Sequence, residues 1–214
     1  NLIASQMLAA APFAKAGALF TDAGSTKGHI VRDVEQHLPA QLAFVGAHPL
    51  AGSEKQGVEF ARAELFVNRI CVLTPTQQTS PQHLEKATLF WQALGCQVAH
   101  LSPEEHDLAL ATTSHLPHFI ASILAANLPT HWQQFAATGF RDTTRIAAGD
   151  PVLWTAIAQE NALALLQTLD QFSHQLAALR SAVLKQDTDE ISRLLAAGKK
   201  VRDALGTREP LGRA

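Results

Sequence analysis

Short apolar runs alternate with longer amphipathic stretches over the first hundred residues. Four runs rich in β-branched and aromatic residues predict strands, at residues 18–21, 42–46, 69–74 and 97–101. Three stretches with helical spacing predict helices, at residues 2–16, 26–38 and 81–94. Because strands that alternate with helices are typical of a parallel α/β sheet, residues 1–101 are expected to form one.

The strand pattern stops after residue 101, and the second half is expected to be all-helical. Ser102-Pro103-Glu104-Glu105 has the spacing of a capping box with proline at the first helical position, which predicts a helix over 103–128. Pro117 lies inside that helix and removes one backbone hydrogen bond, so a bend is expected near Ser114, His115 and His118.

Two further helices are predicted toward the C-terminus. Asp150-Pro151 starts a long helix, and a last helix over 188–205 has Asp187 as its N-cap and ends at Gly206. Apolar residues recur along the long helix at spacings of four and three: Leu165, Leu169, Phe172, Leu176, Leu179 and Val183. Such a seam is typical of a coiled coil and suits a helix partner within the chain or across a dimer, of which we favour the dimer.

The composition is that of an ordinary globular protein. The chain has 214 residues, of which 47% are hydrophobic and 17% charged, and a formal net charge of −2, so no general affinity for nucleic acid is expected. We expect no membrane span and a cytoplasmic location, because the sequence has no run of 18 or more apolar residues and no basic secretory start. Cys71 and Cys96 are widely spaced in apolar segments, which indicates buried free thiols.

Candidate chemistry begins in residues 45–57, where an apolar run breaks into a glycine-rich turn around His48. Histidine is well suited to proton transfer near neutral pH, although a histidine hydrogen-bonded in a surface loop would give the same pattern. Ser25 follows the preceding strand, and ligands bind beyond the carboxyl ends of such strands, so Ser25 and His48 are expected to share one substrate group. Taken alone, Ser25 fits better as the N-cap of the following helix, and the two roles are compatible.

A second group of polar residues lies in the helical half. Arg145 could anchor an acidic substrate, since arginine binds carboxylates through two parallel hydrogen bonds; the alternative is a surface salt bridge with Asp142 or Asp150. His115 and His118 could instead cap a helix or bind zinc. Zinc is the weaker interpretation because their spacing differs from the i, i+4 motif and no third ligand is evident, so we expect no metal.

Several motifs together resemble the prephenate and arogenate dehydrogenase family of tyrosine biosynthesis. They are D-A-G-S-T-K at 22–27, H-P-L-A-G-S-E-K-Q-G at 48–57, L-F-V-N at 65–68, V-L-T-P at 72–75, H-D at 106–107, S-H-L-P-H at 114–118 and G-F-R-D-T-T-R-I-A-A-G-D-P-V-L-W at 139–154. The resemblance covers nearly the whole chain. It implies the C-terminal part of a Rossmann-like dinucleotide-binding domain over 1–101 and an all-helical substrate-binding and dimerisation domain over 102–214.

The resemblance also implies roles for individual residues. His48 matches the base that removes the substrate hydroxyl proton, Ser25 the serine that shares this hydroxyl and the nicotinamide end of the cofactor, and Arg145 the carboxylate-binding arginine. Other matching positions would line the substrate pocket or the cofactor: Ser114, His118, Gly52, Glu54 and Gly24. Asp142 and Trp154 resemble supports for Arg145, through charge pairing and packing.

Family members open with a strand and a G-x-G-x-x-G turn, and neither is found in these 214 residues. The sequence is therefore expected to be truncated, to bind its cofactor weakly and to turn over little alone. The cofactor is NAD or NADP, with NAD favoured. The motifs around His48 and His118 look more like the prephenate-using branch, which makes prephenate the expected substrate.

Two alternatives remain beside this interpretation, and a third is set aside. The chain could be an arogenate dehydrogenase, or a non-catalytic remnant that dimerises or binds the substrate. A serine hydrolase built on Ser25 or Ser114 is set aside, because the sequence has no G-x-S-x-G nucleophile elbow.

Overall fold

The computed structural model describes residues 2–51 and 60–206. Contacts divide the chain into two compact units, Asn1–Leu166 and Gln167–Ala214. The strands are β1 (Leu19–Thr21), β2 (Ala43–Pro49), β3 (Ile70–Thr74) and β4 (Gln97–His100). The helices of the first hundred residues are α1 (Leu2–Ala10), the 3-10 turn η1 (Ala11–Phe13), α2 (Gly28–His37) and α3 (Pro81–Ala93). All four predicted strands and all three predicted helices are thus confirmed, with small shifts of their ends.

The four strands form one sheet in the order β1-β2-β3-β4. β1 pairs with β2 and β3 with β4 in parallel, but β2 and β3 run antiparallel. The α/β class is therefore confirmed, whereas the expectation of an all-parallel sheet is wrong at the central pair. A parallel pair needs a crossover, usually a helix, and the described part of the connection after β2, residues 60–69, contains no α-helix.

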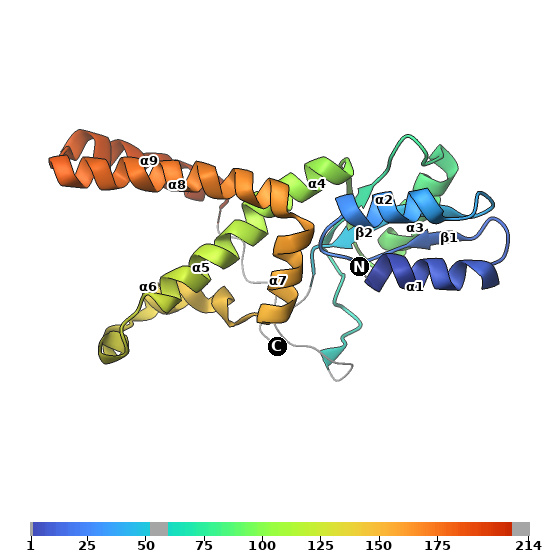
Figure 1. Cartoon of the computed structure of the whole chain (residues 1–214), viewed down its shortest axis with the longest axis horizontal. Helices are drawn as coiled ribbons and strands as arrows, with labels where there is room; N and C mark the ends of the chain where they lie inside the picture. Colours follow the sequence, from blue (N-terminus) through green and yellow to red (C-terminus); the bar gives the residue numbers. More distant parts are fainter. Residues whose placement is uncertain (1, 52–59, 207–214) are drawn as a thin grey trace. The chain divides into compact units, whose positions relative to one another are not determined.

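Helices cover both faces of this sheet (Figure 1). On β2, Phe44 packs with α1 and α2, whereas the next residue, Val45, packs with α3 around Trp91. Successive strand residues point to opposite faces, so a run of apolar residues is needed to bury both. Ser80 caps α3 by accepting a hydrogen bond from the backbone N–H of His83, and Gly95 with φ +89° follows the end of the helix.

The remainder of the first unit is helical. It comprises α4 (Pro103–Leu110), the π-helical turn η3 (Ala111–His115), α5 (Leu116–Ala126), the 3-10 segment η4 (Thr130–Phe135), α6 (Thr138–Thr144), the 3-10 turn η5 (Arg145–Ala148) and α7 (Pro151–Glu160). The capping box at Ser102 and Glu105 is confirmed. The irregularity expected near Pro117 takes the form of η3, in which the Leu116 N–H bonds to the Ala111 carbonyl, five residues back.

Residues 103–126 are long and apolar enough to cross a membrane by length and composition alone. The stretch also contains buried polar groups, at His106, Asp107 and His115. Buried hydrogen-bonded polar residues are typical of a helix inside a folded protein. Core helices of folded proteins can also be long and apolar enough to meet the criteria for a membrane span.

The long helix predicted from Asp150 is in fact two helices. α7 ends at Glu160, Asn161 is non-helical with φ −113° and ψ 32°, and α8 (Ala162–Lys185) follows. In the second unit α8 and α9 (Thr188–Ala204) are joined by a short turn, in which Gln186 has φ 55° and Asp187 caps α9 as predicted. Within this single chain the predicted seam stays open in part, since Leu176 and Val183 are more than half exposed.

Candidate active site

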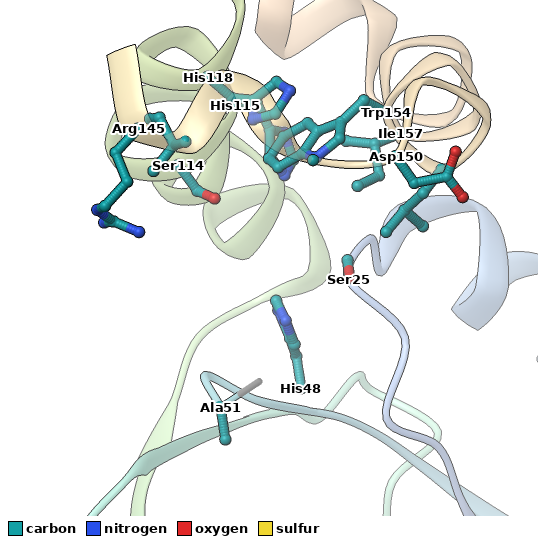
Figure 2. A pocket seen from close by; sticks show the side chains of 13 residues that line it. Ser25, His48, Ala51, Ser114, His115, His118, Arg145, Asp150, Trp154 and Ile157 are labelled. Atoms are coloured by element: carbon teal, nitrogen blue, oxygen red, sulfur yellow. The ribbon is translucent and has the colours of Figure 1, made fainter. Parts of the chain in front are cut away.

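A cavity of about 410 Å³ lies in the first unit, beyond the sheet edge where β1 and β2 end. Its volume falls in the range of small-molecule sites. Ser25, His48 and Ala51 come from the sheet side, and the other lining residues come from the helical part (Figure 2). It is lined by Ser25, His48, Ala51, Ser114, His115, His118, Arg145, Ile146, Gly149, Asp150, Leu153, Trp154 and Ile157.

The loop after β1 is held by a buried ion pair. Lys27 Nζ contacts Asp22 and also donates to the Ala47 carbonyl at 2.9 Å, while Asp22 accepts from the backbone N–H groups of Ala47 and Gly24. Lys27 is fully buried. Burial lowers the pKa of Lys27, and the Asp22 carboxylate opposes this. These contacts fix the ends of β1 and β2 against each other, and with them the spacing of Ser25 and His48.

Ser25 lies on this loop and lines the cavity, as predicted. It is not the N-cap of α2, because that position belongs to Lys27. Within the described residues its hydroxyl has no hydrogen-bond partner, so it is available to a ligand. Gly24 does not line the cavity: a Cβ there would lie 2.6 Å from Ile30 Cδ1 and 2.8 Å from Ile3 Cδ1, so close packing explains this glycine.

His48 lies inside β2 rather than after the strand, opposite Val72 of β3. The antiparallel partner extends β2 beyond the end of β1 and carries the imidazole to the cavity. Its Nδ1 lies 2.9 Å from Nε2 of His106 on α4. Burial, together with the charges of His106, Lys27 and His115, lowers the pKa of His48 from 6.5 to about 3 against the opposing effect of Asp107. His48 is therefore neutral at pH 7 and able to accept a proton.

Behind His48, a carboxylate holds the start of α2. Asp107 Oδ1 accepts from the Lys27 N–H and Oδ2 from the Gly28 N–H, each at 2.8 Å, and His106 Nδ1 lies 2.9 Å from Oδ1. Burial raises the pKa of Asp107, but the hydrogen bonds from His106, Gly28 and Lys27 outweigh it and lower the pKa. Asn161 closes the network by donating to the Asp107 carbonyl at 2.7 Å.

On the helical side, His118 stacks on Trp154 with ring centroids 3.5 Å apart and an interplanar angle of 8°. Burial lowers the pKa of His118. The main chain at Gly149 packs against this pair, since a Cβ there would lie 2.5 Å from Trp154 Nε1 and 2.9 Å from His118 Cε1. Trp154 thus orients His118, and its expected packing against Arg145 stays a prediction.

His115 lines the cavity beside this pair, but its Nδ1 points toward the protein interior. Its Nδ1 lies 3.2 Å from Asn161 Nδ2, and burial lowers its pKa to about 4. Ser114 lines the cavity from the same π-helical turn. The extra residue in that turn rotates the following side chains, and Ser114, His115 and His118 all reach the cavity.

Arg145 starts η5 and reaches the cavity with an exposed guanidinium (Figure 2). The expected pairing with Asp142 is wrong: among the described residues there is no ion pair between them, and Asp142 is exposed on α6 and does not line the cavity. The alternative of a surface salt bridge between Arg145 and Asp142 therefore also fails.

Two predicted residues, Gly52 and Glu54, lie outside the described residues. Sequence reasoning gave no role to His106, Asp107 or Asn161, although the His-Asp pair was among the family motifs. No local pattern links His106 to His48, 58 residues away. Within residues 2–51 and 60–206, no group of three potential ligands could hold a metal ion.

The fold and cavity together define an α/β nucleotide-binding type of domain whose sheet edge opens on a pocket completed by helices. A sequence model described as "Prephenate dehydrogenase, nucleotide-binding domain" matches residues 2–100, and one described as "Prephenate dehydrogenase, dimerization domain" matches residues 102–197. The cyclohexadienyl dehydrogenase of Zymomonas mobilis is 38% identical over 206 residues, 93% of this chain and 70% of that protein. The chain belongs to the prephenate dehydrogenase family.

Other relatives support the same family assignment. The prephenate dehydrogenase of Bacillus subtilis is 37% identical over 197 residues, 89% of this chain and 53% of that protein. The crystal structure of prephenate dehydrogenase from A. aeolicus, in complex with hydroxyphenyl propionate and NAD+, matches with a TM-score of 0.83 and 32% identity, over 92% of this chain and 70% of that one. The chain thus spans between about half and 70% of the length of these relatives.

Proposed function

We propose that this chain carries the catalytic pocket of a prephenate dehydrogenase, which converts prephenate to 4-hydroxyphenylpyruvate and carbon dioxide with hydride transfer to NAD. The observation that supports this best is the convergence on one cavity of a neutral imidazole, a free hydroxyl and an exposed guanidinium, from His48, Ser25 and Arg145. The A. aeolicus relative, crystallised with NAD+ and a hydroxyphenyl acid, also supports it.

The residues present fit the nicotinamide end of the cofactor. The carboxyl ends of the parallel strands β1 and β2 open on the cavity, where dinucleotide folds place their ligands, and the Ser25 hydroxyl, which has no partner among the described residues, is at that edge. When bound, NAD would accept the hydride from the ring carbon that bears the hydroxyl. The Gly24 assignment is not supported by its packing, and weak cofactor binding by the 214-residue chain stays a prediction.

His48 supplies the general base in this proposal. Its neutral imidazole accepts the hydroxyl proton as the carbon–oxygen double bond forms, and Ser25 donates to or accepts from the same oxygen. Arg145 binds a carboxylate of the substrate through two parallel hydrogen bonds and so orients the ring toward His48. Loss of the ring carboxyl group as carbon dioxide makes the ring aromatic, which drives the reaction.

Prephenate is preferred over arogenate because of His118. Prephenate has a ketone in its side chain where arogenate has an ammonium group, and the neutral imidazole of His118, stacked on Trp154, can donate one N–H to a ketone oxygen. We expect His118→Asn to impair the use of prephenate more than that of arogenate. Equal losses would contradict this assignment, and arogenate would then be the second candidate.

A homodimer is part of the proposal. The open apolar seam of α8, with Leu176 and Val183 more than half exposed, and the match to a dimerisation domain support pairing through the helical half. We keep the cytoplasmic location and the absence of nucleic-acid and membrane partners as expectations. Sedimentation of the chain over a range of concentrations tests the dimer.

Titration calorimetry with prephenate, with and without NAD, tests the function. We expect prephenate to bind, and Arg145→Ala to weaken binding by about 10- to 100-fold, because a charge-assisted hydrogen-bond pair to a carboxylate is lost. The matched control is Arg141→Ala, since Arg141 lies on α6 outside the cavity and bonds only the Ala136 carbonyl among the described residues.

The same samples, mixed with prephenate and NAD, are followed by the absorbance of NADH. Turnover that His48→Gln abolishes would support the proposal. Prephenate binding without NADH formation would agree with the weak cofactor binding expected of this chain as well as with a non-catalytic remnant. Failure to bind prephenate, or equal losses in the two arginine variants, would contradict the pocket assignment.

A further inference from the structure

A continuous chain of hydrogen bonds runs from the cavity to the start of α2, through His48, His106 and Asp107. Only His48 lines the cavity; His106 is fully buried and Asp107 is 8% exposed. Of these three residues, the proposed reaction uses only His48. The two buried residues behind it therefore need a separate explanation, because buried ionisable groups are costly to the fold.

The direction of these hydrogen bonds follows from Asp107. Its two oxygens face the backbone N–H groups of Lys27 and Gly28, which can only donate, so the carboxylate can only accept there. The N-terminal end of a helix also favours a negative charge. Since Oδ1 already accepts from Lys27 as an ionised oxygen, the contact with His106 requires a proton on His106 Nδ1.

The next contact then has one direction for a neutral His106. With its proton on Nδ1, its Nε2 carries a lone pair and can only accept, so His48 Nδ1, at 2.9 Å, must be the donor. A neutral imidazole has one N–H, and His48 spends it on this bond. Its Nε2 is left unprotonated, and among the described residues it has no partner, so it is free to act toward the cavity.

We propose that His106 and Asp107 are positioning residues that hold His48 in the tautomer with its proton on Nδ1, so that Nε2 presents a lone pair to the substrate. The inference rests on the proposed function for its purpose, since it explains why His48 is ready to act as a base. The hydrogen-bond arrangement itself can be measured without any reaction. A neutral histidine side chain in water prefers the other tautomer, with the proton on Nε2, so this network reverses the ordinary preference.

The rigidity of this arrangement has an additional source. Gly28, whose N–H bonds to Asp107, leaves no space for a side chain, because a Cβ there would lie 2.9 Å from Asp107 Oδ2. Asn161, the residue after α7, fixes the backbone carbonyl of Asp107. Asp107 is thus held through both its carboxylate and its main chain, and the rings of His48 and His106 keep an edge-to-face angle of 63° at a centroid distance of 5.1 Å.

Nitrogen-15 NMR of the histidine rings in the whole 214-residue chain at pH 7 tests the proposal. The two ring nitrogens of a neutral histidine have well-separated shifts, depending on which one carries the proton. In the wild type we expect His48 to be protonated on Nδ1. His106→Leu should shift the population of His48 toward the Nε2-protonated form, and His106→Gln should restore the Nδ1 form, because the amide oxygen can accept the same hydrogen bond.

His100→Gln is the matched control: it removes an exposed histidine from β4, so the His48 signals should not change. The proposal is overturned if wild-type His48 carries its proton on Nε2, as it would if His106 were protonated on both nitrogens and donated to His48. It is also overturned if the tautomer is the same in folded His106→Leu. Should that variant not fold, the wild-type spectrum and His106→Gln decide.

This outcome is separable from that of the proposed function. The tautomer is read in the absence of prephenate and NAD, so a chain without turnover can still confirm the network. In an active enzyme, His106→Leu should lower kcat much more than it raises KM for prephenate, because His106 does not line the cavity.

Discussion

Replacing Asp107 with alanine should destabilise the first unit through the start of α2. The substitution removes an acceptor used by the Lys27 N–H, the Gly28 N–H and His106, all more than half buried. A buried donor left without a partner costs about 1–3 kcal/mol, and water can reach the half-buried Gly28 N–H, so we expect a total loss of about 3 kcal/mol. For a chain of this size, that corresponds to a decrease in Tm of about 6–12 °C.

Urea unfolding followed by tryptophan fluorescence measures this loss. Glu104→Ala is the control, because Glu104 is an exposed carboxylate in the first turn of the same helix and should change stability little. Asp107→Asn should also destabilise, since its amide group places a donor opposite a backbone donor. Equal losses in Asp107→Ala and Glu104→Ala would refute the role of Asp107 in holding α2.

The pH dependence gives a second check on Asp107. Its pKa in the folded chain lies below the ordinary value of 3.8, so the ionised form is favoured by folding. Its contribution to stability is therefore fully present above about pH 5 and is lost as the pH falls through the folded pKa. The difference between wild type and Asp107→Ala should be constant from pH 7 to 5 and should shrink below 3.8.

Three further outcomes are expected. Gly149→Ala should cost about 1–3 kcal/mol of stability and weaken prephenate binding, because its Cβ would collide with the stacked rings of Trp154 and His118. The control Gly139→Ala should be neutral or slightly stabilising, since a Cβ there would meet no atom within 4 Å. Urea unfolding and calorimetry compare the two variants, and similar effects in both would exclude the steric explanation. The pKa of His48 falls from 6.5 to about 3 on folding, so its NMR shifts should stay constant from pH 7 to 5, and a titration midpoint near 6.5 would contradict this. The free energy of unfolding should decrease as the pH falls below 6.5, because His48 then takes up a proton only in the unfolded chain. Lys27→Met should lower the free energy of unfolding by about 3–5 kcal/mol, because it leaves the Asp22 carboxylate buried without its partner. The control is Lys86→Met, at an exposed lysine, and an equal loss in the two variants would show that the buried pair contributes little.

Much of the local structure could be predicted from spacing alone. The caps at Ser80, Ser102 and Asp187 depend on residues three positions away, so each is visible in a few letters of sequence. The apolar runs identified the strands because both faces of the sheet are covered. The break at Asn161 was missed because the apolar period on either side of it gives no sign that one residue leaves the helical conformation.

The site was predicted in part. Ser25, His48, Ser114, His118, Arg145 and Trp154 were named from motifs, and the structure places all of them around one cavity. The charge pairing given to Asp142 was wrong and the stacking of Trp154 on His118 was not foreseen, because the motif shows which residues recur together and not which atoms meet. Stacking of Trp154 on His118 depends on how η5 and α7 pack against α5, over more than 30 residues of chain.

The sequence by itself determined the succession of strands and helices and the residue types that the pocket contains, since both follow from interactions between near neighbours and from side-chain chemistry. The tertiary structure alone decided that β3 runs against β2, which extends β2 to carry His48 to the cavity, and that Asp107 meets the start of α2 from 80 residues away. Contacts over such separations depend on how the whole chain closes, and no local spacing encodes them.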